Sequence, residues 1–281
     1  MFPVGGWVML ATHTPMLNSD SFLVLVGPLL QLPLLIILFR GGHYRRFPFF
    51  CLYTAYSMIM SGLHVWAMAH AALFFVLYWI TEAILSLLEL LALHEAFKPS
   101  LQAFYEVYRW IRLAPPAIVT LILGTALYRA AYHPVGRGPL VRLAAGAYAF
   151  EVGVRALEIA IFVLTLKLAR KEHHPIGSPH PFGVVVGFGI AATGTLLADL
   201  IGFNLGFRFG HGFEIVFRYL PSAVYVGAVI TWLIAFTSKE PPHVPLSREE
   251  VERRRREQER VIGSLRKESP RKRGFFRLSG I

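Results

Sequence analysis

Long apolar blocks constrain this chain more than any other feature of its sequence. Of the 281 residues, 55% are hydrophobic and only 16% are charged, whereas a soluble domain carries about a quarter charged residues. The apolar residues run in continuous blocks, and blocks of about 18 or more residues with few charges are typical of transmembrane helices. The sequence therefore predicts an all-α, polytopic membrane protein whose transmembrane domain occupies residues 1–238.

Seven apolar blocks predict a seven-transmembrane helical bundle. The turn between the second and third blocks is very short, so these two helices should be antiparallel and in direct contact. The first block has no basic segment before it and no clear cleavage site after it, so we expect it to be retained as a helix. The predicted spans are about 21–39, 47–69, 73–97, 113–132, 140–169, 182–206 and 213–237.

The distribution of lysine and arginine predicts the orientation of the bundle. The loops after the first, third and fifth blocks, together with the C-terminal tail, hold 22 of these residues, against 5 in the other loops. Basic loops stay on the cytoplasmic side of a membrane. We therefore expect the N-terminus outside, the C-terminus in the cytoplasm, and a multi-pass location in the plasma (inner) membrane.

The C-terminal segment, residues 239–281, is the part of the chain that resembles a soluble protein. It holds 13 of the 28 lysines and arginines against 7 acidic residues. Ser247 and Glu250 form a capping-box pattern ahead of one amphipathic helix at about 248–268. A basic cytoplasmic tail suits the anionic lipids of the inner leaflet. We expect membrane lipid as its partner, with a possible protein partner and no nucleic acid.

Polar residues inside four of the blocks recur at helical spacing. Each set occupies one face of its helix, and we expect the four faces to line one interior, with the first and fourth blocks peripheral because they lack comparable residues. The stripes contain Tyr53, Ser57, Ser61 and His64 in the second block, Tyr78, Glu82, Ser86 and Glu89 in the third, Tyr148, Glu151, Arg155 and Glu158 in the fifth, and Asp199 in the sixth.

Arg155 is the only cation in these stripes. At about 1.5 Å of rise per residue, it lies roughly 22 Å from the outer end of its helix, level with Glu89 at roughly 24 Å. An ion in an apolar interior needs a partner of opposite charge, and both Glu151 and Glu158 are within reach on the same helix. Asp199 and His64 lie nearer the outer side, where they form an outer gate or line a wet cavity.

Four carboxylates, those of Glu82, Glu89, Glu151 and Glu158, face this one arginine. Not all of them can be ionised in a low-dielectric interior. The cluster is therefore either a structural ion network or a site that titrates, binds a cation or switches a helix interface. Both interpretations stay open at the level of sequence.

Motifs for catalysis or metal binding are weak. His94 and Glu95 begin like a zinc-protease motif, but Lys98 occupies the position of the second histidine. The histidines at 173, 174 and 180 are interpreted as a solvated loop. The single cysteine, Cys51, excludes an internal disulfide and a cysteine-based zinc cluster. We predict no catalytic residue, no metal, no cofactor and no enzyme activity.

The leading hypothesis is a sensory or signal-transducing, receptor-like module without an output domain of its own. Seven helices with a short basic tail are a common topology for such modules, although topology alone does not give function. A small-solute or proton-coupled transporter is the alternative. A lipid-modifying membrane enzyme and a scaffold subunit are further alternatives.

Gly183 and Gly187 predict close helix packing.

Overall fold

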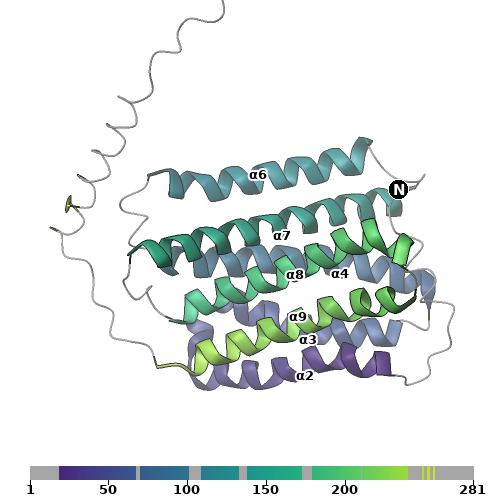
Figure 1. Cartoon of the computed structure of the whole chain (residues 1–281), viewed down its shortest axis with the longest axis horizontal. Helices are drawn as coiled ribbons and strands as arrows, with labels where there is room; N and C mark the ends of the chain where they lie inside the picture. The colour runs from purple at the N-terminus through teal and green to yellow at the C-terminus, as the bar shows by residue number, and fades with distance from the viewer. Residues whose placement is uncertain are drawn as a thin grey trace, which may run out of the picture.

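A computed structural model describes residues 19–67, 70–100, 109–132, 138–172, 179–209 and 211–239, together with 249, 252, 253 and 256. These residues form seven α-helices and one 3₁₀ turn, and no strand occurs among them. The helices run side by side along a common axis, as Figure 1 shows. The all-α prediction is therefore confirmed for the described part of the chain.

Each predicted apolar block contains one helix, and the helix ends differ from the predicted ends by a few residues. Proline opens three of them, where its missing N–H has no intrahelical partner to lose. The elements are α2 (Ser19–Arg40), η1 (His43–Arg45), α3 (Pro48–Ala67), α4 (Ala71–Ser100), α6 (Arg109–Tyr132), α7 (Pro139–Glu172), α8 (Pro179–Phe209) and α9 (His211–Thr237).

Three helices are long and apolar enough to cross a membrane. The qualifying stretches are Leu73–Phe97 in α4, Pro179–Leu200 in α8 and Leu220–Thr237 in α9. Shorter apolar stretches cover Val26–Arg40 in α2 and Pro116–Tyr132 in α6. Membrane-spanning character is thus supported for part of the bundle, and the complete seven-span topology stays a prediction.

The helices are stacked so that α4, α7 and α8 occupy the middle of the bundle (Figure 1). Within the described residues, α6 packs only against α7 at one edge, while α2 packs against α3, α9 and η1 at the opposite edge. The peripheral position predicted for the fourth block is therefore confirmed. The first block is peripheral too, since α2 lies at the opposite edge, although its one interior polar residue, Gln31, is fully buried.

The contact between α3 and α4 is antiparallel, as the short turn predicted. Near the start of α3, the Phe50 N–H donates to Glu95 Oε2 at 3.1 Å, near the end of α4. Near the end of α3, His64 Nε2 lies 2.7 Å from Thr81 Oγ1, in the first half of α4. Glu95 therefore satisfies one of the N–H groups that the first turn of α3 leaves unpaired.

Glycines allow α8 and α9 to approach closely. A Cβ atom added at Gly187 would overlap the indole of Trp232, and one at Gly183 would overlap Ala235. Trp232 is fully buried, and its Nε1 donates to the Val184 carbonyl at 3.3 Å. Its ring meets Phe50 edge-on with centroids 5.2 Å apart. The small residues predicted for close packing therefore create the slot that holds this tryptophan.

The C-terminal end of α9 is held by aromatic and imidazole rings. His180 is buried, stacks on Phe236 with ring centroids 5.2 Å apart, and meets His43 of η1 edge-on at 4.6 Å. Its Nε2 lies 3.3 Å from the Ser238 carbonyl. The interpretation of His180 as part of a solvated loop is wrong, because Pro179 begins α8 and carries His180 into the bundle. The other two histidines of that loop lie outside the described residues.

Little of the predicted tail helix falls within the described residues. Glu249, Glu252, Arg253 and Arg256 are helical, and Arg256 Nη2 donates to Glu252 at 3.4 Å. The capping-box residues Ser247 and Glu250, and the rest of the predicted helix at 248–268, lie outside them.

The slot for Trp232 yields a test of the packing between α8 and α9. Gly187→Ala places a methyl group against the indole, and overpacking of this kind costs about 1–3 kcal/mol. We expect a lower free energy of unfolding, measured by denaturant titration in detergent micelles. Gly227→Ala is the matched control, because a Cβ at Gly227 meets nothing within 4 Å and alanine favours the helix. Equal loss of stability in both variants would contradict the slot.

Candidate functional site

Arg155 of α7 joins two of the central helices through ion pairs. One turn earlier on the same helix, Glu151 pairs with the Arg155 Nη2 atom. Across the interface with α8, the Arg155 Nη1 atom lies 3.6 Å from Asp199 Oδ2. The Arg155 side chain is 19% exposed and that of Asp199 is 46% exposed. The guanidinium thus forms one of its two ion pairs with a side chain that is partly exposed at the surface of the bundle.

The remaining glutamates of the cluster lie along the interface between α4 and α7. Glu82 and Glu89 of α4 are within electrostatic range of Arg155. Glu158 of α7 is 2% exposed, and the charged side chains of Glu89 and Arg155 interact with it electrostatically. The Glu158 Oε1 atom is buried without a hydrogen-bond partner. The structure therefore places all five predicted members together. Arg155 forms its ion pairs with Glu151, which is one of the five, and with Asp199, which is not.

Ser86 lies on α4 between the two glutamates, four residues after Glu82 and three before Glu89. It is 1% exposed, and its hydroxyl has no hydrogen-bond partner. Its position on the same helix face places it within the cluster. A buried polar group without a partner costs about 1–3 kcal/mol, so Ser86 and Glu158 are two expensive groups at one interface.

A second set of polar side chains connects α3 to α2 and to α9. Gln31 Nε2 of α2 donates to Ser57 Oγ of α3 at 3.2 Å and to the Tyr225 hydroxyl of α9. Ser57 Oγ and the Tyr225 hydroxyl are 3.3 Å apart. We call these three residues the polar knot. It joins the consecutive helices α2 and α3 to α9, whose Tyr225 lies 168 residues beyond Ser57 in the sequence.

Tyr53 connects the polar knot to the charge cluster. Its side chain is 2% exposed, and its hydroxyl interacts with the Tyr225 hydroxyl on one side and with the Glu89 carboxylate on the other. Its ring packs against Phe188 of α8 with centroids 5.1 Å apart. A path of polar groups therefore runs from α7, through α4 and α3, to α9.

The other predicted lining residues lie apart from this path. His64 bonds Thr81 and its ring lies 5.6 Å from that of Tyr78, nearer the start of α4. Ser61 donates to the carbonyl of Ser57 in its own helix at 2.8 Å. Tyr78 still interacts electrostatically with Glu82, so it borders the cluster, whereas Ser61 is a local helix contact.

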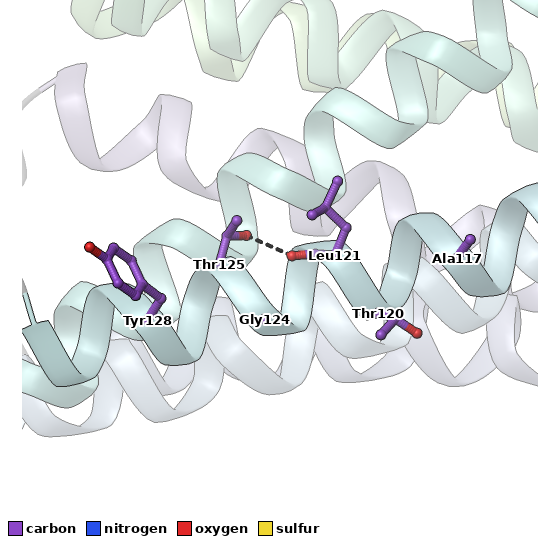
Figure 2. Close-up of a pocket in the computed structure, with 6 residues that line it drawn as sticks. All are labelled: Ala117, Thr120, Leu121, Gly124, Thr125 and Tyr128. Carbon is purple, nitrogen blue, oxygen red and sulfur yellow. Dashed lines mark hydrogen bonds between the residues drawn. The ribbon is translucent and has the colours of Figure 1, made fainter.

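A shallow hollow of about 460 Å³ lies elsewhere, on the outward face of α6. Figure 2 shows its six lining residues, all from this one helix: Ala117, Thr120, Leu121, Gly124, Thr125 and Tyr128. Thr125 Oγ1 donates to the Leu121 carbonyl at 3.0 Å in its own helix. The hollow contains no ionisable group except the Tyr128 phenol, and no member of the charge cluster lines it. It is a helix face rather than a reaction site.

Sequence reasoning missed two members of the polar network, Gln31 and Tyr225. Gln31 stands alone in its apolar block, whereas Tyr225 lies at helical spacing from Arg218 and Ser222, a stripe in the seventh block that the prediction did not include. A lone glutamine within a predicted span is a usable signal, because an amide in an apolar interior needs a partner. Asp199 was recognised as a polar residue of its block, but its ion pair with Arg155 was not predicted.

No group of three or more histidine, cysteine or acidic side chains in the described part of the chain is arranged to hold a metal ion. Comparison with protein-family models, with curated proteins and with solved structures finds no match to this chain. The geometry of the cluster and of the polar network is therefore what points to a function.

The ion pair between Arg155 and Glu151 makes a quantitative prediction. Arg155→Gln leaves the buried Glu151 carboxylate without its cation, and breaking a buried pair in this way costs about 3–5 kcal/mol. Asp199→Asn should cost no more than about 1 kcal/mol, because that partner is half exposed. Denaturant titration in micelles measures both.

The double variant Arg155→Gln with Glu151→Gln is the control for this prediction. It removes both charges together, so it should be less destabilised than the sum of the two single variants. Additive losses would show that the two side chains are not coupled, and the ion pair would then not hold the cluster.

Proposed function

We propose that this protein is a membrane sensor, a signal-transducing module in which the buried charge cluster is the switch and α9 carries its state to the basic tail. The observation that supports this most directly is the path from Glu89 through Tyr53 to Tyr225 on α9. A switch needs a bistable element and a connection to an output. Here the cluster is the bistable element, and α9 is the connection to the output.

The cluster suits a switch because its charges are not balanced. Arg155 is paired with Glu151 and Asp199, which leaves Glu82, Glu89 and Glu158 dependent on protonation or on a bound cation. A change of charge at Glu89 alters the hydrogen bond that Tyr53 makes to it. Tyr53 also interacts with Tyr225, so such a change alters the contacts that hold α9 in place.

The end of α9 is built to report such a displacement. Thr237 is the last residue of the helix, and Phe236 and Ser238 contact His180 of α8. His43 of η1 adds a third element to this contact. A small movement of α9 is therefore transmitted to a junction of three segments at the point where the tail begins.

The proposal includes a seven-span, multi-pass topology in the plasma (inner) membrane, with the tail in the cytoplasm. The exposed Arg40, Arg45 and Arg46 beside η1 would then share the inner surface with the tail. Such a surface binds anionic lipid, and a protein partner at the tail would receive the signal. The module is proposed to act without enzyme activity.

A distance measurement between the bundle and the tail tests the switch. Spin labels are placed at Tyr44→Cys and Glu249→Cys in a Cys51→Ala background, and electron–electron resonance gives the distance distribution in lipid nanodiscs. Glu89→Gln should shift the distribution, because it removes the charge that faces Tyr53. Adding Tyr225→Phe should abolish that shift, since it removes the hydroxyl on α9.

Glu95→Gln is the matched control for this measurement. It changes a carboxylate on the same helix that bonds the first turn of α3 and lies outside the cluster. Its distribution should equal that of the parent. Identical distributions for the parent and Glu89→Gln would refute the coupling of the cluster to the tail.

The topology is tested by labelling single cysteines with a membrane-impermeant maleimide in intact cells. His70→Cys and Gly138→Cys should react without permeabilisation, because their loops are proposed to lie outside. Tyr44→Cys and Lys239→Cys should react only after permeabilisation, since basic segments remain inside. Labelling of Lys239→Cys in intact cells would reverse the proposed orientation.

A small-solute or proton-coupled carrier is the competing function for the same cluster. A carrier needs access to its site from both sides of the membrane. In the described conformation the cluster reaches the surface through the half-exposed Asp199, while Glu158 is enclosed. Flux measured in proteoliposomes separates the two functions.

A further inference from the structure

The hydroxyl of Ser86 behaves differently from other hydroxyls in the described helices. Serine and threonine side chains within a helix commonly donate to the carbonyl four residues earlier. Thr54, Thr165 and Thr193 do so at 2.9, 2.7 and 2.6 Å, respectively. Ser86 Oγ is buried and makes no such bond. It is therefore available to a group that sits at the interface of α4 and α7.

Glu158 supplies a second available atom at the same interface. Its Oε1 is buried without a hydrogen-bond partner, and its carboxylate repels that of Glu89 across the interface. Within the described residues, Arg155 makes its ion pairs with Glu151 and Asp199 and makes none with Glu158. The environment of Glu158 is thus rich in oxygen atoms and short of positive charge.

We propose that Ser86, Glu89 and Glu158 form a binding site for one small monovalent cation, either a sodium ion or a proton. The Tyr53 hydroxyl, which interacts with Glu89, closes the site on the side of α3. Hydroxyl and carboxylate oxygens are the ligands that hard cations prefer. One positive charge here offsets the repulsion between the two glutamates and gives the Ser86 and Glu158 oxygens a partner.

The titratable groups around the site are those of the helices packed against it. Glu82, Glu89 and Tyr78 lie on α4, Glu151 and Arg155 lie on α7, Asp199 lies on α8, and Tyr53 lies on α3. The described side chain of α6 that carries a charge is Arg129, which lies in the last turn of that helix and is exposed. A single cation therefore enters a surrounding that contains more acids than bases.

This inference names the stimulus of the proposed sensor and in that respect rests on the proposed function. The two remain separable, because binding is measured on the bundle and signalling on the tail. Cation-dependent stability without movement of the tail labels would support the site and overturn the sensor. If the tail labels move in Glu89→Gln while the stability of the parent does not depend on cations, the sensor is supported and the cation site is overturned.

The test is the thermal unfolding midpoint of the purified full-length chain in micelles. In the first arm, NaCl replaces choline chloride at constant ionic strength and fixed pH. If sodium is the ligand, the midpoint of the parent rises and saturates, as expected for a ligand that binds the folded state. Ser86→Ala should require about tenfold more sodium, the loss expected for one hydrogen-bonding ligand, and Glu158→Gln should not respond.

In the second arm, pH is varied in choline chloride, and infrared difference spectra follow the carbonyl stretch of protonated carboxyl groups. If the proton is the ligand, the midpoint is insensitive to sodium, and a protonated carboxyl band disappears in Glu158→Gln. Ser86→Ala should shift the position of this band, because it removes a neighbouring hydroxyl, even if Glu158→Gln fails to fold.

Ser61→Ala is the matched control, since Ser61 bonds its own helix. It should reproduce the parent in both arms. The proposal is overturned if the parent responds to neither sodium nor pH in these measurements. It is also overturned if Ser86→Ala and Glu158→Gln both respond as the parent does.

Discussion

One arginine among an excess of carboxylates is the constraint on which the interior of this bundle depends. An ion cannot be taken into an apolar interior without a partner, because the loss of hydration costs several kcal/mol. Arg155 meets this requirement with Glu151 on its own helix and Asp199 on α8. The pairing links α7 to α8, and it leaves the other acids at the contact of α4 and α7 to be neutralised in another way.

The rest of the bundle is held by packing and by polar contacts between helices. Gly187 and Gly183 bring α8 and α9 together around Trp232, while Gln31, Ser57 and Tyr225 bind α2, α3 and α9. Small residues at helix contacts and interhelical hydrogen bonds are also the contacts by which helices associate in membranes. Both kinds of contact occur on α9, where Trp232 packs against α8 and Tyr225 makes the polar contacts.

This arrangement is the physical basis of the proposal that α9 carries a signal. The helix contacts the polar path in its middle and the rings of His180 and His43 at its end. A rigid helix with contacts at both points transmits a displacement over its length. The same arrangement explains why the apolar hollow on α6 is unconnected to the site, since α6 packs only against α7 within the described residues.

The sequence alone determined the helical architecture and which polar residues share one face of a helix. Apolar blocks of spanning length leave the helix as the structure that satisfies its own backbone in lipid, and helical spacing put Glu82 with Glu89 and Arg155 with Glu151. These are properties of single helices. Only the tertiary structure decided the pairing of Arg155 with Asp199, the burial of His180 and the joining of Gln31 to Tyr225. Each of these depends on the rotation and depth of one helix against another, which the period of a single helix does not specify.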